Sequence, residues 1–117
     1  MAILETIAFV SDVKKSKQGN FFVTFSYLTG RSVNGKKEKQ FINCTSSKKV
    51  KAVSEEIFKS QSVVDGKTVH KLSGKLVKIK IRDPYFYIYE NNDNASLQSN
   101  GLLIELNQHA RSIAATV

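Results

Sequence analysis

The sequence predicts an all-β domain with one short helix, folded as a five-stranded Greek-key barrel. Most of the 117 residues fall into short segments rich in β-branched and aromatic residues, separated by turn pairs that contain glycine. Only one segment shows helical spacing, and it lies between the third and the fourth of the β segments. This length supports one domain. We expect residues 1–108 to form it and residues 109–117, which show little pattern, to be a flexible tail.

The first half of the chain predicts three consecutive antiparallel strands. Residues 3–13 alternate as a strand, and the pair Gly19-Asn20 then marks a tight turn. Residues 21–28, rich in aromatic and β-branched side chains, form a second strand that pairs back on the first. A polar loop at residues 29–37 contains Asn34-Gly35, a strong hairpin signal, and leads to a third strand at residues 38–45. The tight first turn has no room for a helix, which excludes a ferredoxin-like fold.

The one helix follows the third strand. Its start is predicted by the hydroxyls of residues 45–47, which can cap the first turn, and its end lies near Ser60. Val50, Val53 and Ile57 recur at helical spacing and predict its buried face.

Two further strands complete the predicted barrel. The pair Asp65-Gly66 turns the chain into a fourth strand at residues 72–82, with Gly74 as a bulge or bend. Pro84 separates this strand from a fifth at residues 85–90. Residues 91–94 form a loop, and residues 101–107 form a short extra C-terminal strand. The order β-β-β-α-β-β is the connectivity of the OB-fold.

Charge is the most informative bulk property. The chain has 18 lysines and arginines against 10 acidic residues, a net charge of +8. Residues 1–82 hold 17 of the basic and 6 of the acidic residues, whereas residues 83–117 hold one basic and four acidic. A positive field of this kind favours a polyanionic partner, because basic side chains displace condensed counterions from phosphates. A merely soluble basic protein is the alternative.

The predicted fourth strand alternates between two kinds of side chain. Val77, Ile79 and Ile81 share one face, and Lys78, Lys80 and Arg82 share the other. Cations about 6.6–6.8 Å apart can follow a nucleic-acid backbone. The alternative is an ordinary solvated face whose lysines protect a strand edge.

Aromatic residues point to single-stranded ligands. Tyr85, Tyr87 and Tyr89 share one face of the predicted fifth strand, and such rings can stack on unpaired bases. A barrel interior or a dimer seam lined by tyrosines is the alternative. On the second strand, Phe22 and Tyr27 are the aromatic residues that we expect to be exposed.

Two basic connections complete the predicted site. OB domains bind oligonucleotides across their second and third strands and through their first and fourth loops. Here the fourth loop, expected around Asp83-Pro84, is short, so we expect the long second loop to act as an arm over the ligand. Lys48, Lys49 and Lys51 fit a solvated helix face. The basic residues of the first and second connections are Lys14, Lys15, Lys17, Arg31, Lys36, Lys37 and Lys39.

Nothing in the sequence favours catalysis. It has no Gly-rich phosphate loop, no Cys-x-x-Cys pair and no His-Glu metal spacing. His70 and His109 are far apart, and the single cysteine, Cys44, fits a buried position in a reducing compartment. We therefore expect a non-enzymatic cytoplasmic protein with no cofactor and no metal, and no segment that inserts into a membrane.

The strand order, the basic stretch at residues 78–82 and the tyrosines at residues 85–89 together resemble the small single-stranded DNA-binding proteins of filamentous bacteriophages. The resemblance covers residues 3–107. It implies a homodimer that coats single-stranded DNA during DNA replication, with little sequence specificity and in the host cytoplasm. Two other classes stay open. One is an RNA-binding translational regulator, since the sequence cannot separate ribose preferences; the other is a protein-interaction module such as an inhibitor or assembly factor.

Overall fold

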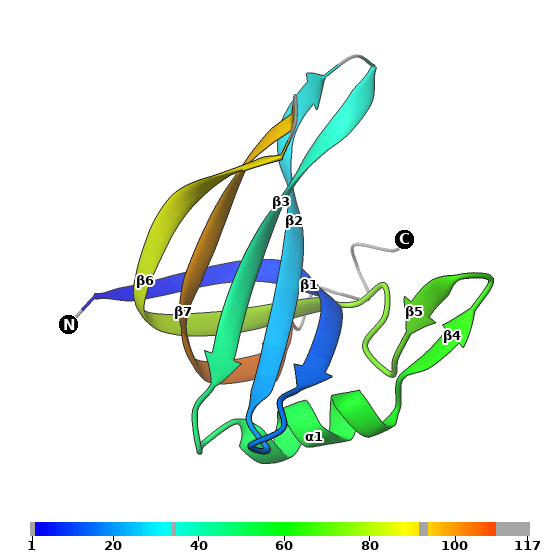
Figure 1. The fold of residues 1–117 in the computed structure, drawn as a ribbon, viewed down its shortest axis with the longest axis vertical. Coiled ribbons are helices and arrows are strands. Elements are labelled where there is room, and N and C mark those ends of the chain that lie inside the picture. Colours follow the sequence, from blue (N-terminus) through cyan, green and yellow to red (C-terminus); the bar gives the residue numbers. More distant parts are fainter. Residues whose placement is uncertain (1, 34, 92–93, 110–117) are drawn as a thin grey trace.

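Five strands close into a barrel in which each strand is hydrogen-bonded to two neighbours (Figure 1). The computed structural model describes residues 2–33, 35–91 and 94–109. Within these ranges, the backbone but not the side chain is described for residues 29, 31, 33, 36–39, 86–91 and 94–99. The strand order is β1-β2-β3-β7-β6, with β6 paired to β1. The barrel strands are β1 (Ile3–Lys15), β2 (Phe21–Val33), β3 (Lys36–Ser46), β6 (Leu76–Asn91) and β7 (Asn94–Gln108).

Strand β1 closes the barrel because its two halves pair with different strands. Its first half pairs antiparallel with β6, from Ile3 opposite Arg82 to Phe9 opposite Leu76. Its second half pairs antiparallel with β2, and the register shifts between Val10 and Asp12. Such a bulge bends a strand and increases its twist, which lets β1 pass from one partner to the other. The only parallel pairing among the described barrel strands joins β3 to β7.

The core is made by the inward positions of all five strands and by one face of the helix. Helix α1 (Lys51–Lys59) lies across one end of the barrel (Figure 1). Ile57 and the preceding Val50 are buried, and Val53 packs partly against the core, as the helical spacing predicted. The buried apolar residues are Ala8, Val10, Val13, Phe21, Val23, Phe25, Ile42, Cys44, Val50, Ile57, Val77, Ile79, Ile81, Leu103 and Leu106.

The predicted hydroxyl cap of the helix was wrong. The N-cap position is Val50, and no side chain caps it, because the chain makes an extra turn after β3 before α1 begins. The hydroxyls act differently. Those of Ser46 and Ser54 lie 2.6 Å apart, and Ser54 also donates to the carbonyl of Val50. The serines thereby tie the helix to the end of β3. Within the described ranges, no helix is long and apolar enough to span a membrane.

The predicted fold class, a five-stranded barrel with one helix between the third and fourth barrel strands, is confirmed. The boundaries of the last two strands differ from the prediction. Strand β6 continues through Pro84, so residues 85–90 are its distal half, and residues 101–107 are part of β7. Pro84 is tolerated because it lies in a bulge that needs no ladder hydrogen bond. The fourth connection of the barrel is therefore at residues 91–94 and not around Asp83.

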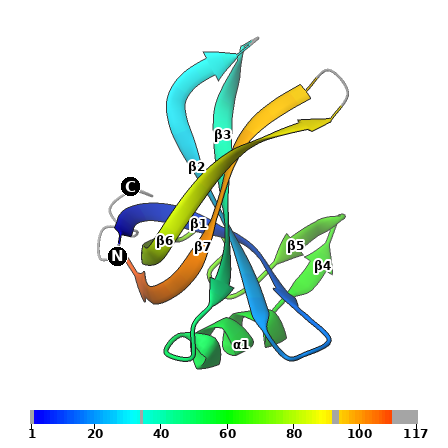
Figure 2. The same ribbon diagram turned by 60° about the vertical axis from the view of Figure 1, so that its left-hand side comes forward.

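The predicted second loop is also mostly strand. Strand β2 extends to Val33 and β3 begins at Lys36, so residues 29–37 form the outer part of a hairpin. Gly30, with a φ of 85°, lies where the register between the two strands shifts. Figure 2 shows this hairpin and the β6–β7 hairpin projecting from the same end of the barrel, opposite α1. The segment that the sequence predicted as an arm is thus a β-hairpin.

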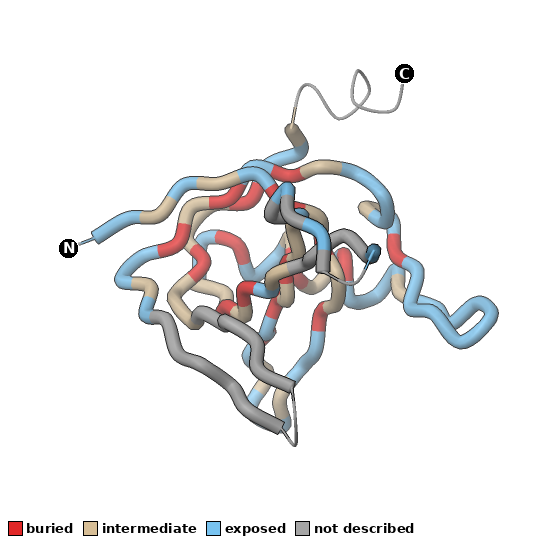
Figure 3. The backbone as a smooth tube through the Cα atoms, turned by 90° about the horizontal axis from the view of Figure 1, so that it is seen from above, coloured by how far each residue is buried: buried red, intermediate tan, exposed pale blue. Residues whose placement is uncertain are grey.

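A small hairpin between α1 and β6 is missing from the sequence prediction. Strands β4 (Ser62–Val64) and β5 (Lys67–Val69) pair around Asp65 and Gly66, which have φ values of 51° and 76°. Two consecutive positive φ angles are typical of a tight hairpin turn. All residues of both strands are exposed, and the hairpin stands away from the barrel (Figure 3).

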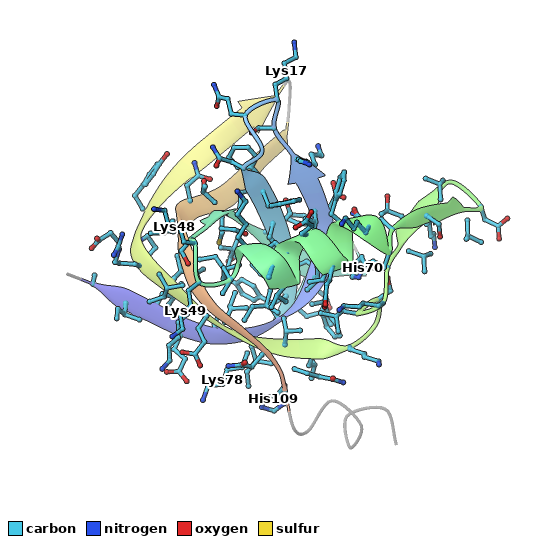
Figure 4. The ribbon with its side chains drawn as sticks, turned by 90° about the horizontal axis from the view of Figure 1, so that it is seen from below. Lys17, Lys48, Lys49, His70, Lys78 and His109 are labelled. Atoms are coloured by element: carbon cyan, nitrogen blue, oxygen red, sulfur yellow. The ribbon has the colours of Figure 1, made fainter. Side chains whose placement is uncertain are left out.

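His70 ties the base of this hairpin to the barrel. Its ring is buried, and its Nε2 lies 2.9 Å from the carbonyl oxygen of Val10. Its Nδ1 accepts the backbone N–H of Leu72 at 3.2 Å, so Nε2 carries the proton and donates to Val10. Figure 4 shows His70 at the junction of the hairpin and the barrel. The histidine is thus a structural anchor.

Cys44 is buried in β3, as predicted, and burial raises the pKa of its thiol from 9.0 to about 12. A raised pKa means that the folded protein holds this proton more tightly than the unfolded chain does. The contribution of the Cys44 thiol to the free energy of unfolding is therefore complete below pH 9 and is lost as the pH rises toward 12.

We expect Cys44→Ala to have a flatter decline of unfolding free energy between pH 8.5 and 11 than the parent, as measured by urea denaturation. Native alkylation by iodoacetamide at pH 8 should be much slower than alkylation in 8 M urea, because the thiolate is the nucleophile. Equal alkylation rates in the two solvents would contradict a buried thiol.

Candidate nucleic-acid interface

The outer face of β2 and β3 carries two exposed aromatic rings. Inward and outward residues alternate along both strands, so Phe22 points away from the buried pair Phe21 and Val23, and Phe41 points away from Ile42. Phe22 is 44% exposed and Phe41 38% exposed. Both rings are therefore accessible to a ligand on this side of the barrel.

A bulge in β6 brings the basic residues and a tyrosine onto the same outer face. Arg82 pairs with Leu102, but Tyr85 pairs with Asn100, so β6 has one residue more than β7 between these pairs. The extra residue shifts the alternation of β6 by one position. Lys78, Arg82 and Tyr85 are therefore all exposed, and Tyr85 reaches 59%. The basic stretch and the first tyrosine lie end to end on one strand.

The bulge is held by the first residues of the chain and by a glycine. Asp83 has a φ of 50°, its N–H donates to the carbonyl of Ala2, and its carboxylate accepts the N–H of Ala2 at 3.0 Å. On β7, a Cβ at Gly101 would lie 2.3 Å from Cγ2 of Ile81 and 3.2 Å from Cα of Pro84. The close approach of β6 and β7 at this point depends on glycine.

A hollow of about 380 Å³ crosses β2, β3, β7 and β6 on this face. Two hydrogen bonds join neighbouring strands there: Thr24 Oγ1 donates to Asn43 Oδ1 at 2.9 Å, and Asn100 Nδ2 donates to the Tyr85 hydroxyl at 2.9 Å. Rings and amides together can stack on a flat ligand and hydrogen-bond to its edge. The hollow is lined by Phe22, Asn43, Cys44, Thr45, Tyr85, Asn100, Gly101 and Leu102. We call this surface, together with Phe41, the aromatic face.

The basic residues around the aromatic face differ in their partners. Lys78 Nζ lies 2.7 Å from Glu5, and this hydrogen bond lowers the pKa of Glu5 and raises that of Lys78. Lys80 Nζ lies 3.4 Å from Glu105. A phosphate would have to compete with these carboxylates.

Several exposed cations have no ion pair within the part of the chain that the structure describes, and four of them border the aromatic face. They are Arg82 at the β6 bulge, Lys17 at the β1–β2 turn, and Lys48 and Lys49 directly after β3, so all four belong to elements that border the aromatic face. Figure 4 shows the three lysines at the helix end of the barrel. These four unpaired charges thus lie beside the exposed rings.

The other predicted site residues fall into two groups. Lys14 lies 4.0 Å from Asp12, and Lys15 lies over the ring of Phe21 at 5.8 Å. The expected exposure of Tyr27 was wrong, because its ring is half-buried against the core and its hydroxyl donates a hydrogen bond to Gln40. The second group has only its backbone described, and its side chains lie outside the described part. It comprises Arg31, Lys36, Lys37 and Lys39 on the β2–β3 hairpin and Tyr87 and Tyr89 on β6.

Sequence reasoning missed three residues of the aromatic face and misjudged two lysines. Phe41, Asn43 and Asn100 were not singled out, and Lys48 and Lys49 were assigned to a helix face although they precede α1. The alternation of Phe41, Ile42, Asn43 and Cys44 was a usable signal, because the two smaller apolar residues face the core. Asn100 had no such signal, since its position depends on the β6 bulge.

Three or more His, Cys, Asp or Glu side chains do not cluster in a metal-binding arrangement anywhere in the described ranges. His70 is fully occupied by its two backbone contacts, and the Cys44 thiol is buried and protonated. The chemistry offered by the described surface is that of stacking, hydrogen bonding and charge.

No protein-family model matches the chain, and no curated protein matches it in sequence. Its structure is similar to that of the small single-stranded DNA-binding protein from Streptomyces coelicolor, with a TM-score of 0.54 and 6% identity over 93% of this chain and 94% of that one. It is also similar to the mitochondrial single-stranded DNA-binding protein Rim1 from S. cerevisiae, with a TM-score of 0.51 and 11% identity over 92% and 93% of the two chains. At these identities the likeness establishes the barrel fold.

Proposed function

We propose that this protein binds single-stranded DNA and coats replicating strands with little overall sequence specificity. The observation that carries the proposal is the exposure of Phe22, Phe41 and Tyr85 on one outer face of the barrel. A folded protein exposes such rings together where they are used for contact, and a row of rings beside cations is how single-strand binders hold bases and phosphates. The two solved structures described above are named as single-stranded DNA-binding proteins, which supports the proposal. It assigns no catalytic activity to the chain.

In this binding mode the aromatic face stacks on bases while unpaired cations follow the phosphates. Lys17, Lys48, Lys49 and Arg82 provide the main charge contacts, because no carboxylate within the described ranges competes for them. Lys78 and Lys80 belong to the same contact set with a smaller share, since each already holds an acid. The basic β2–β3 hairpin, with Arg31, Lys36, Lys37 and Lys39, is proposed as an arm over the bound strand.

The comparison that tests the function is single-stranded against duplex DNA of the same sequence. Stacking needs unpaired bases, so the single strand should bind more tightly than the duplex in fluorescence anisotropy at moderate salt. A matched RNA oligonucleotide tests the preference for DNA, because a translational regulator would bind RNA more tightly. Equal or tighter binding of duplex would overturn the proposal.

The unpaired lysines predict a specific salt dependence. We expect Lys48→Glu with Lys49→Glu to weaken binding to every sequence and to reduce the slope of log affinity against log salt. The slope should fall by at least about 0.7 for each phosphate that the variant no longer neutralises. Anisotropy titrations at four or more salt concentrations measure this slope.

The matched control reverses two exposed lysines on the side of the β4–β5 hairpin, Lys67→Glu with Lys75→Glu. It changes the net charge by the same amount, so an effect of net charge alone would change the DNA affinity and the salt slope of both variants equally. Neutralising Lys78 and Lys80 to glutamine should flatten the slope less than the Lys48 and Lys49 reversal does, because Glu5 and Glu105 already screen those lysines. The same slope in the Lys48/Lys49 variant and the parent would exclude these two lysines from the site.

We further propose a homodimer of the filamentous-bacteriophage type that acts in the cytoplasm of the host cell. The exposed β4–β5 hairpin has two outer strand edges with no partner among the described elements, and it also exposes Val63, Val64 and Val69. Such an edge is often paired across a two-fold axis. Light scattering with and without DNA tests this, and a monomer at high micromolar concentration in both states would count against it.

A further inference from the structure

We propose that residues 110–117 dock into a groove between the barrel and the β4–β5 hairpin and thereby fix the hairpin against the barrel. The groove has a volume of about 400 Å³. Strands β1 and β2 form its floor, and Thr68 of β5 with the turn before β6 forms its wall. The inference goes beyond the proposed function and does not depend on it.

The groove offers an apolar but uncharged surface. Phe9 and Leu28 face outward on its floor, and Leu28 is 46% exposed. Among the described residues that line the groove, none is a lysine, arginine, aspartate or glutamate. A nucleic-acid backbone therefore finds no cation here to neutralise its phosphates, whereas an uncharged segment with apolar side chains can bury surface on both the floor and the wall.

Strand β7 ends close to this groove. The backbone N–H of His109 donates to the carbonyl of Leu76 at 3.0 Å, and Figure 4 shows His109 at the end of β7. Because β7 runs antiparallel to β6, its continuation passes Gly74, which lines the groove. Leu76 pairs with Phe9 of β1, and Phe9 in turn pairs with Ser26 of β2.

The length of the segment is sufficient. Neighbouring strands lie about 4.8 Å apart, so Phe9 is roughly 10 Å and Ser26 roughly 15 Å from His109. An extended chain covers about 3.3 Å per residue. The fourth residue after His109, which is Ile113, therefore reaches Phe9, and the residues after it reach Ser26.

The composition of the segment matches the groove. Residues 110–117 lie outside the described part of the chain, and from residue 112 to 117 their order is Ser-Ile-Ala-Ala-Thr-Val. Apolar side chains at 113, 115 and 117 alternate with small ones, which is the pattern of an extended segment with one buried side. No charged side chain follows Arg111, so the segment can enter an uncharged groove without burying a charge.

Two pairs of new cysteines test the placement. Ile113→Cys is combined with Ser26→Cys on the groove floor, and in the control with Ile7→Cys. Ile7 is exposed and lines a separate hollow together with His109, so a segment that does not dock can reach it as well. The native Cys44 is buried and burial raises its pKa to about 12, so it does not compete for the new thiols.

Equilibration with glutathione measures the effective concentration of one thiol at the other. We expect the value for Ile113/Ser26 to exceed that for Ile113/Ile7 by at least about tenfold, because a docked segment holds its partner in place. Circular dichroism establishes that both variants are folded. A ratio near one would overturn the proposal. A disulfide that forms only between two chains, seen on a non-reducing gel, would also overturn it, because the groove would then hold the segment of a second copy.

Hydrogen exchange of the hairpin gives an independent readout. Ile113→Asp places a charge on the side of the segment that enters the groove, so the backbone amides of residues 62–69 should exchange at least about threefold faster than in the parent. The matched control, Ser112→Asp, adds the same charge at the neighbouring position on the other side and should exchange like the parent. Equal exchange in the two variants, measured by mass spectrometry, would mean that the segment does not hold the hairpin.

Discussion

Replacing Phe22 and Phe41 together by alanine is expected to weaken single-stranded DNA binding by at least about 30-fold. Both rings are exposed on the outer face of the barrel, so they are available to stack on bases. Stacking contributes about 1–3 kcal/mol for each base, and each 1.4 kcal/mol is a factor of ten in affinity. Anisotropy with one oligonucleotide over a range of salt measures both affinity and salt slope, and the slope should stay that of the parent.

The control for this variant removes exposed apolar side chains elsewhere. Ile3→Ala with Ile7→Ala truncates two residues of β1 that are exposed and lie outside the aromatic face. Its affinity should equal that of the parent. If the double phenylalanine variant melts like the parent and binds as tightly, these rings do not stack on the ligand. A large fall in its melting temperature would instead show that the rings serve stability.

The fold was predictable because its main determinants are local. The turn at Gly19-Asn20, the hairpin at Asn34-Gly35 and the spacing of Val50, Val53 and Ile57 each depend on a few neighbouring residues, and the structure has a turn, a hairpin and a helix at these places. The division of the last two strands was wrong at Pro84. Proline normally interrupts a strand, and nothing local shows that a bulge anchored by Ala2, far away in sequence, allows β6 to continue.

The candidate site was predictable only in part, because it is assembled from separate strands. The expected exposure of Phe22 and Tyr85 followed from alternation within one strand and agrees with the structure. The pairing of Lys78 with Glu5 and of Lys80 with Glu105 was not visible, since it depends on the registers of β6 with β1 and β7. The hollow joins four strands, and two of its bordering residues, Asn43 and Asn100, meet through the parallel pairing of β3 and β7.

Gly101→Ala is expected to lower the free energy of unfolding by about 1–3 kcal/mol. The new Cβ would lie 2.3 Å from Cγ2 of Ile81, a fully buried side chain, and 3.2 Å from the backbone of Pro84. Because these neighbours are a buried side chain and the backbone, we expect β6 to shift away from β7. For a domain of this size the melting temperature should fall by roughly 5–15 °C, measured by circular dichroism or calorimetry.

A double-mutant cycle identifies the cause of this destabilisation. Ile81→Ala alone should cost about 2–5 kcal/mol through the cavity that it leaves. Combined with Gly101→Ala, the destabilisation should be smaller than the sum of the two single effects, because the new methyl group occupies the space of the removed Cγ2. Additive effects would mean that the contact with Ile81 is not what makes Gly101 necessary.

The bulge at Asp83 and Pro84 changes which residues of strand β6 face outward. Before it, even-numbered residues face solvent; at Tyr85 the outward position is odd-numbered. If β6 ran through this point as a regular strand with the same residues, Tyr85 would fall in phase with Val77, Ile79 and Ile81 and point into the barrel. Deletion of one of the two bulge residues would instead give a regular strand that keeps Tyr85 on the outer face, in phase with Lys78, Lys80 and Arg82. Substitutions along β6 change one contact at a time, whereas the number of residues between Arg82 and Tyr85 decides whether the strand needs a bulge to keep Tyr85 outside. In comparing relatives of this protein, the spacing between the last lysine or arginine and the first tyrosine of this strand therefore carries more information than the identity of the residues between them.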